Sequence, residues 1–186
     1  PANTMQEFVA YAKANPGKLA FGSSGLGSMT QMVCELTKAS GQIDMLHVPY
    51  RGGGEALTDL LAGHIQVFCE GNVLPHVKAG KVRLLAVADD ERHPDFPDVP
   101  MLKEIWPEAD AVSWGGLFAP AGTPDPIIRR LSAELIRIAQ DPELRAQMQK
   151  AAVRPAGSTP EALAADLKKD WERYSKLVRD LNIKLE

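Results

Sequence analysis

Three short apolar segments in the first half of the chain are each followed by a turn of small or polar residues and then by a helical pattern. The segments are 19–21, 43–48 and 65–69, and the turns after them are 22–28, 49–54 and 70–72. Strands that alternate with helices favour an α/β fold with a mainly parallel sheet. Ligands bind beyond the carboxyl ends of the strands in such folds, so the three turns together predict a binding site.

The turn at 22–28, Gly-Ser-Ser-Gly-Leu-Gly-Ser, carries the strongest chemical signal. A helix is expected over 29–36, because its apolar residues fall at helical spacing. A helix that begins in such a turn presents free backbone N–H groups and the positive end of its dipole, which suit a carboxylate or a phosphate. The same residues also suit a plain capped turn, and this stretch alone leaves both interpretations open.

The composition is that of an ordinary globular protein. The chain has 186 residues, a net charge of -3, 45% hydrophobic residues and 24% charged residues. This length allows one medium domain or two small lobes. The absence of a basic patch argues against a nucleic-acid partner, and no apolar run approaches the roughly 20 residues of a membrane-spanning helix. Metal ligands at useful spacing are also absent, so we expect no metal and no cofactor.

The two cysteines leave the cellular compartment open. Cys34 falls in the predicted helix and Cys69 ends the third apolar segment. The favoured interpretation is two small core residues, while a bridge between them stays open for an exported protein. The chain begins at Pro1 and shows no signal-peptide pattern, as expected of a mature form, a recombinant form or a fragment.

Further elements follow from local patterns. Helices are expected over 5–14, 55–62, 73–79 and 101–105, with Gly41 and Gly63 ending the helices before them. The apolar run 82–88 predicts a buried strand, and 112–118 predicts a strand interrupted by two glycines. A charged, Pro-rich surface loop separates them.

The second half of the chain predicts helices only. Thr123, Asp141 and Thr159 each precede a proline and are expected to cap three successive helices. The last helix carries an apolar stripe formed by Leu163, Leu167, Trp171, Tyr174 and Val178. Such a stripe needs a sheet to cover, and this half supplies no strands for one.

An ordered set of short motifs resembles a known family over essentially the whole chain. The motifs are Pro16-Gly-Lys-Leu19, Gly22-Ser-Ser-Gly-Leu-Gly-Ser28, His47-Val-Pro-Tyr-Arg-Gly52, Asp59-Leu-Leu-Ala-Gly63, Lys78-Ala-Gly-Lys-Val-Arg-Leu-Leu-Ala-Val87, Pro97-Asp-Val-Pro100, Ser113-Trp114, Ala119-Pro-Ala-Gly-Thr-Pro124 and Gly157-Ser-Thr-Pro-Glu161. Together they resemble the Bug family, the substrate-binding receptors of tripartite tricarboxylate transporters.

The resemblance implies an α/β, periplasmic-binding-protein-like (type II) fold with two lobes. Residues 1–17 would be a helix and crossover from the first lobe, and 18–112 the complete second lobe. Residues 113–119 would be the hinge crossover, and 120–186 the C-terminal helices of the first lobe. Family members carry further βα units and a signal peptide before the matching segment, so the resemblance implies a partial chain. Apolar surface would then be left bare, unless the chain self-associates.

The resemblance also implies a function. Such receptors are periplasmic, catalyse nothing, and deliver a small carboxylate to a membrane permease. The ligand would be a di- or tricarboxylate, an acidic amino acid or an aromatic acid. With one lobe incomplete, we expect the chain alone to bind ligand weakly or not at all.

The family pattern assigns ligand-facing residues to the three turns. From the first turn and the helix after it these are Ser24, Gly25, Gly27, Ser28 and Thr30, from the second Tyr50 and Gly52, and from the third Glu70 and Asn72. The chain departs from the family at Gln31, where histidine is frequent, and at Glu70. A carboxylate at Glu70 would repel a ligand carboxylate, unless it pairs with an amino group on the ligand or points away.

Two other functions compete with a receptor. Gly25-Leu-Gly27 with Thr30 approximates the fingerprint of dinucleotide-binding enzymes, but the third glycine position and the acidic residue after the next strand do not fit. The effector-binding domain of a transcription regulator shares the two-lobed fold, although no DNA-binding segment is present. His47 is interpreted as structural, because it precedes Val48-Pro49 in a predicted strand, and Ser24 lacks the Gly-x-Ser-x-Gly frame of a nucleophile.

Overall fold

The computed structural model describes residues 2–150, 153–180 and 183, which form two compact units. The first unit extends to Ser113, and the second is Trp114–Asp180. The lobe boundaries predicted from the sequence refer to a longer receptor and stay a prediction.

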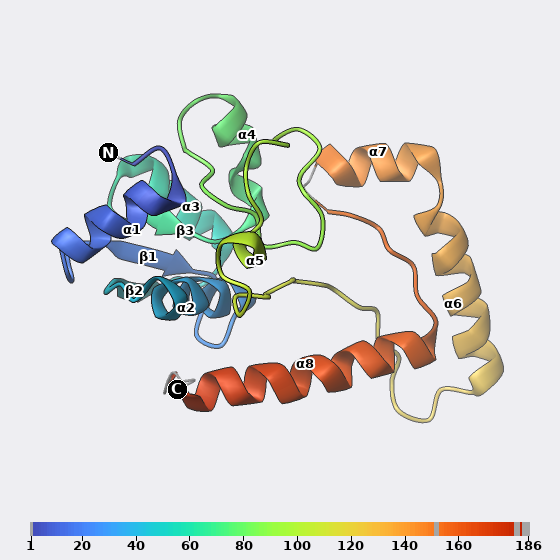
Figure 1. Cartoon of the computed structure of the whole chain (residues 1–186). Coiled ribbons are helices and arrows are strands. Elements are labelled where there is room, and N and C mark those ends of the chain that lie inside the picture. The colour runs from blue at the N-terminus through green and yellow to red at the C-terminus, as the bar shows by residue number, and fades with distance from the viewer. Residues whose placement is uncertain (1, 151–152, 181–182, 184–186) are drawn as a thin grey trace. The chain divides into compact units, whose positions relative to one another are not determined.

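A three-stranded parallel sheet is the centre of the first unit (Figure 1). The strands are β1 (Ala20–Ser23), β2 (Leu46–Pro49) and β3 (Val67–Phe68), in the order β2-β1-β3. This confirms the predicted α/β class. Because all three strands run the same way, the turns that follow them meet at one edge of the sheet.

The crossovers place helices on both faces of this sheet. α2 (Met29–Gly41) connects β1 to β2, and α3 (Gly53–Ala62) connects β2 to β3 in the opposite direction. Right-handed crossovers in opposite directions put their helices on opposite faces, as Figure 1 shows. β1 is therefore covered from both sides, and its Phe21 side chain is fully buried.

The first helix, α1 (Met5–Ala14), forms as its pattern predicts. Thr4 caps it, because the Glu7 backbone N–H donates to Thr4 Oγ1 at 3.1 Å. Its buried residues, Met5, Phe8 and Ala12, recur at helical spacing. The helices α4 (Leu74–Lys78), preceded by a single 3₁₀ turn at Gly71–Val73, and α5 (Leu102–Ile105) lie in the predicted positions.

The end of α2 differs from the prediction. Gly41 is still helical, and the left-handed residue that closes the helix is Gln42, with φ 51°. A Cβ at Gly41 would lie 3.5 Å from the Trp106 ring, an ordinary van der Waals contact, so packing does not require the glycine there. Gly63, by contrast, closes α3 with φ 80°, as predicted.

The two strands predicted at 82–88 and 112–118 are wrong. In the described residues, 82–88 forms one isolated bridge, between Val87 and Met101. The Val87 N–H donates to Pro100 O at 2.9 Å, and the Leu102 N–H donates to Val87 O at 2.8 Å. The segment therefore meets the region before α5 and adds no strand to the sheet. Residues 113–118 are exposed and have no strand to pair with.

The second unit consists of α6 (Asp125–Ala139), α7 (Pro142–Lys150) and α8 (Pro160–Asp180). Asp141 and Thr159 cap α7 and α8, because their side-chain oxygens accept backbone N–H groups of the first turn. The cap predicted at Thr123 is wrong: α6 begins after Pro124, one residue later than expected, and the Thr123 hydroxyl donates to Pro120 O at 2.8 Å.

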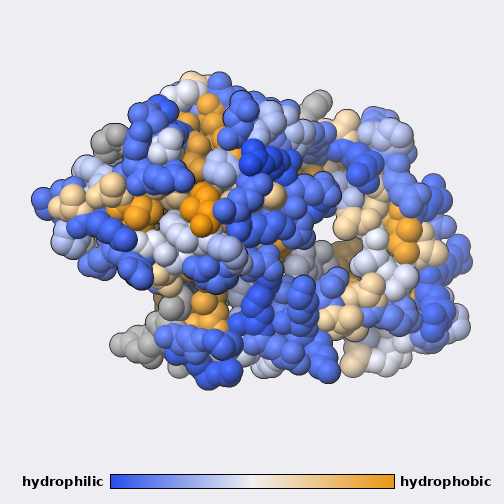
Figure 2. Space-filling model, viewed as in Figure 1, coloured by the Kyte–Doolittle hydropathy of each residue, from blue (hydrophilic) through white to orange (hydrophobic). Residues whose placement is uncertain are grey.

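Large apolar side chains of the second unit are exposed. Leu117 is 74% exposed, Phe118 69% and Trp171 74%. Apolar residues also reach the surface over α6 (Figure 2), where Ile127 and Leu131 are about half exposed. The described residues of this unit contain no strand. The prediction of bare apolar surface is thus confirmed.

Candidate functional site

The three turns predicted to share a site lie together at the carboxyl edge of the sheet. The Tyr50 backbone N–H donates to Ser23 O at 3.0 Å, which joins the first turn to the second. The Glu70 carboxylate lies against Gly53, which joins the third turn to the second. The structure therefore brings together the candidates that the sequence places on separate turns.

The glycine loop (residues 22–28) reverses the chain in front of α2. Gly25 has φ 127° and Gly27 has φ 72°, conformations that L-residues with side chains rarely adopt. Ser28 is the N-cap of α2, and its hydroxyl both donates to Gly25 O at 2.6 Å and accepts from the Gln31 N–H. The capping role considered from the sequence is therefore present.

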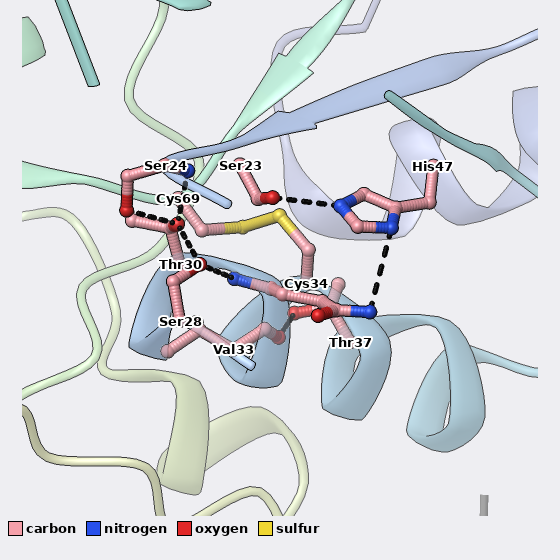
Figure 3. The surroundings of a disulfide bond; sticks show 10 residues. Ser23, Ser24, Ser28, Thr30, Val33, Cys34, Thr37, His47 and Cys69 are labelled. Atoms are coloured by element: carbon pink, nitrogen blue, oxygen red, sulfur yellow. Dashed lines mark hydrogen bonds between the residues drawn. A yellow bond between two sulfur atoms is a disulfide. The ribbon is translucent and has the colours of Figure 1, made fainter. Parts of the chain in front are cut away.

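Thr30 joins both ends of this loop to the first turn of α2 (Figure 3). Its Oγ1 accepts the Ser24 N–H at 2.8 Å and lies 3.0 Å from Ser24 Oγ and 2.9 Å from Ser28 Oγ. Thr30 is only 7% exposed, so these hydroxyls are held by one buried anchor. Three predicted site residues thus form a single hydrogen-bonded cluster.

The backbone N–H groups around the loop divide into two sets. Those of Ser24 and Gly27 already have acceptors, Thr30 Oγ1 and Gln31 Oε1. Those of Leu26, Met29 and Thr30 have none among the described residues. The last two are at the N-terminus of a 13-residue helix, where the dipole favours negative charge. The edge therefore offers unsatisfied donors and a positive potential to an anion.

Tyr50 and Gly52 contribute differently from the hydroxyl cluster. The Tyr50 hydroxyl donates to Asp59 Oδ2 at 2.7 Å, and burial together with this bond raises the pKa of Tyr50 to about 12. Its hydroxyl hydrogen is therefore committed to Asp59. Gly52 is the N-cap of α3, and a side chain there would meet open space within 4 Å.

Glu70 points at the first turn of α3. A Cβ added at Gly53 would lie 2.3 Å from Glu70 Oε2, so the carboxylate occupies the space that only a glycine leaves. Oε2 is buried with no hydrogen-bond partner among the described residues, as is Asn72 Oδ1. Burial raises the pKa of the Glu70 carboxyl above its ordinary value. The third turn therefore brings an acceptor-rich surface close to the site.

Cys34 and Cys69 form a disulfide, so the interpretation as two separate core residues is wrong (Figure 3). Their Cα atoms lie 6.0 Å apart, because α2 packs beside the end of β3. The bridge ties the helix of the glycine loop to the turn that carries Glu70. The signal for this pairing was that α2 begins and β3 ends at the same edge of the sheet, with Cys34 near the start of α2 and Cys69 just after β3.

Sequence reasoning missed two polar residues that support the loop. Gln31 accepts the Gly27 N–H at 2.8 Å, and His47 Nε2 lies 2.7 Å from Ser23 Oγ. No carboxylate completes a catalytic triad here, because the other ring nitrogen faces the Gln31 amide at 3.4 Å. In the part of the chain that the structure describes, no cluster of three His, Cys, Asp or Glu side chains is placed to hold a metal.

None of the described helices is long and apolar enough to cross a membrane. The unsatisfied donors at the sheet edge remain the clearest chemical feature of the described residues. Comparison with known proteins bears on what this edge binds.

The family model described as the tripartite tricarboxylate transporter family receptor, TctC, matches residues 1–183. A protein named for the tcbD–tcbE intergenic region of a Pseudomonas species is 36% identical over 178 residues, which are 94% of this chain and 53% of that relative. The chain thus spans about half the length of this curated relative.

Two solved structures match the fold closely. The periplasmic binding protein BugD has a TM-score of 0.87 and 27% identity, over 99% of this chain and 63% of BugD. MatC from Rhodopseudomonas palustris, solved with bound malate, has a TM-score of 0.81 and 30% identity, over 96% of this chain and 63% of MatC. The resemblance to the Bug receptors and the fold that it implies are confirmed.

Proposed function

The chain belongs to the tripartite tricarboxylate transporter receptor family, and we propose that it forms part of a receptor that captures a small carboxylate for delivery to a membrane permease. The observation that carries this proposal is the N-terminus of α2. There, free N–H groups of Met29 and Thr30 stand beside the Ser24 hydroxyl, which lies 3.0 Å from Thr30 Oγ1, while the Ser28 hydroxyl donates to Gly25 O and supports the loop. One carboxylate would be bound through these donors without an arginine or lysine.

The ligand class follows from the donors and from a relative. MatC is solved with malate, a small dicarboxylate. We infer a small di- or tricarboxylate, or an acidic or aromatic acid, one carboxylate of which lies at α2. The remaining contacts would come from a second lobe closing on a hinge, and closure shifts a two-state equilibrium by its differential contacts with the ligand.

We place the receptor in the periplasm. The disulfide between Cys34 and Cys69 supports this placement, because such bonds persist in oxidising compartments. BugD, which shares the fold, is a periplasmic binding protein. Catalysis is not part of the proposal: the family match is to receptors, and Ser23, which lies 2.7 Å from His47 Nε2, is fully buried, with the Gln31 amide in place of a carboxylate at the other ring nitrogen.

Calorimetry tests the proposal. A full-length form of the receptor should bind one or more members of a carboxylate panel, while the present chain binds them weakly or not at all. Micromolar binding by the present chain alone would overturn the half-site argument. Binding of nicotinamide dinucleotides or sugar phosphates by the full-length form, without carboxylates, would favour the enzyme alternative. An effector-binding regulator domain would be favoured by an upstream DNA-binding segment in place of an export signal.

Replacing Glu70 should strengthen carboxylate binding. In Glu70→Gln, the like charge near the site is lost, and we expect an affinity gain of about 1 kcal/mol, roughly fivefold. Calorimetry with malate on the full-length form measures it. Glu55→Gln is the matched control. It removes an exposed carboxylate from the first turn of α3, the turn that Glu70 contacts, and should change the affinity little. Weaker binding in Glu70→Gln would instead indicate that the Glu70 carboxylate accepts a hydrogen bond from the ligand, such as one from the malate hydroxyl.

The exposed apolar surface of the second unit should make the chain self-associate. Apolar patches of this kind are covered by other protein surface in most soluble proteins. Sedimentation of the chain should show concentration-dependent association, reduced in the double variant Phe118→Ser, Trp171→Ser. A monomer at all concentrations in the unaltered chain would contradict this expectation.

A further inference from the structure

His47 sits at the centre of a hydrogen-bond chain that reaches two glycines of the glycine loop, and the proposed function leaves it without a role. It lies on β2, one strand away from the loop's own strand. Its ring stacks on Phe21, with 4.7 Å between centroids and 14° between planes. The stacking fixes the ring plane, and hydrogen bonds at the two ring nitrogens fix which of them carries the proton.

The Gln31 amide sets the state of one ring nitrogen. The Gly27 backbone N–H donates to Gln31 Oε1 at 2.8 Å, which fixes the orientation of the amide. The Gln31 NH₂ group therefore faces His47 Nδ1, at 3.4 Å. An amide NH₂ only donates, so Nδ1 must accept and carries no proton.

The other ring nitrogen connects to Gly25. In the neutral ring with Nδ1 unprotonated, Nε2 carries the hydrogen and donates to Ser23 Oγ at 2.7 Å. The Ser23 hydroxyl in turn donates a hydrogen bond to Gly25 O at 3.1 Å. One neutral imidazole thus holds Gly25 through Ser23 and Gly27 through Gln31.

Protonation of this ring breaks the chain. A hydrogen on Nδ1 would face the two hydrogens of the Gln31 amide, so the amide must turn. After this turn the Gln31 NH₂ group faces the Gly27 N–H. Two donors then face each other, and the hydrogen bond from Gly27 to Gln31 is lost. Either way the hold on Gly27 ends.

We propose that neutral His47 is a positioning residue, which holds the glycine loop in its carboxylate-binding geometry and releases it on protonation. This inference rests on the proposed function of the loop. Acidification would then weaken carboxylate binding by protonating the His47 imidazole, which does not itself contact the ligand.

The charged groups facing His47 come from α2. Burial lowers the pKa of the His47 imidazole, Glu35 raises it and Lys38 lowers it. Glu35 and Lys38 also pair with each other, at 3.2 Å. Because the pKa in the folded state lies below the ordinary value of about 6.5, the neutral ring's contribution is fully present above that value. It is lost as pH falls through the folded value.

Nuclear magnetic resonance on the present chain tests the hydrogen-bond chain without any ligand. We expect the His47 ring to show the Nε2–H tautomer at neutral pH. The Gly25 and Gly27 amide signals should shift with the titration of His47 and not with that of His64, an exposed histidine on the same unit. Two results would overturn the inference: the Nδ1–H tautomer at neutral pH, or Gly25 and Gly27 amide signals that do not shift as His47 titrates.

Two variants separate positioning from general stability. In Gln31→Glu, the new carboxylate accepts from a protonated Nδ1, so we expect the His47 pKa to rise by about one unit or more. Hydrogen exchange at Gly27 should then be slowest with the ring protonated, the reverse of the unaltered chain. In His47→Phe, the glycine amides should lose the titration that follows the imidazole in the unaltered chain. Retention of that titration would overturn the inference.

A binding measurement on the full-length form completes the test, with malate as the probe. As pH falls through the His47 titration observed by nuclear magnetic resonance, affinity should fall about tenfold more in the unaltered receptor than in His47→Phe, which reports the ligand's own titration. Equal falls would overturn the inference. Absence of carboxylate binding at every pH would overturn the proposed function, while the tautomer result would still decide whether His47 holds the loop.

Discussion

Replacing Cys34 and Cys69 together by alanine is expected to lower the free energy of unfolding by about 3–4 kcal/mol. The bridge joins positions 35 residues apart, and opening it frees a loop of that length in the unfolded chain. Urea denaturation followed by circular dichroism measures the change.

Reduction provides the matched control for this prediction. The unaltered chain in a thiol reductant should unfold at the urea concentration of the double variant, and the reductant should leave the variant unchanged. If oxidised and reduced chains differ by less than about 1 kcal/mol, the bridge does not tie α2 to the end of β3 as described.

Thr30→Val should remove most of the carboxylate affinity. The substitution keeps the side-chain volume but deletes Oγ1. This oxygen accepts the Ser24 N–H and lies within hydrogen-bond distance of the Ser24 and Ser28 hydroxyls. The donors that face the ligand then lose their common anchor. We expect a loss of about 2 kcal/mol, roughly thirtyfold in affinity, measured by calorimetry with malate on the full-length form.

Thr37→Val is the control for Thr30→Val. Thr37 lies on the same helix and is also buried, but its hydroxyl donates within the helix, to Val33 O at 2.8 Å. Its loss should change affinity by less than about twofold. Equal losses in the two variants would show that helix stability, and not the loop anchor, determines binding.

The strand–turn–helix units were predictable because their signals are local. The helical spacing after Ser28, the glycines of the loop and the caps at Asp141 and Thr159 depend on neighbouring residues alone. The family resemblance rested on the same local motifs. Fold class therefore followed from the sequence.

Features that depend on distant residues could not be predicted in this way. The apolar run 82–88 fits a strand locally, but a strand also needs a neighbour, and the run finds only Met101. The pairing of Cys34 with Cys69 required the packing of α2 beside β3. His47 looked merely structural because its bonds to Ser23 and Gln31 span 24 and 16 residues.

The candidate site shows the same division. Sequence named Ser24, Ser28 and Thr30, and the structure shows how the three are linked. That these residues bind ligand stays a prediction, as does the role of the second and third turns. Gln31 was noted only as a departure from the family, while its bond to Gly27 supports the loop.

The most direct test of the central claim is an amide chemical-shift titration of the isotope-labelled chain with malate. We expect weak, saturable binding, with the largest shifts at the free N–H groups of Leu26, Met29 and Thr30, and no such shifts with the uncharged dimethyl ester of malate. Shifts of equal size with the ester, or malate shifts that avoid the N-terminus of α2, would contradict the central claim.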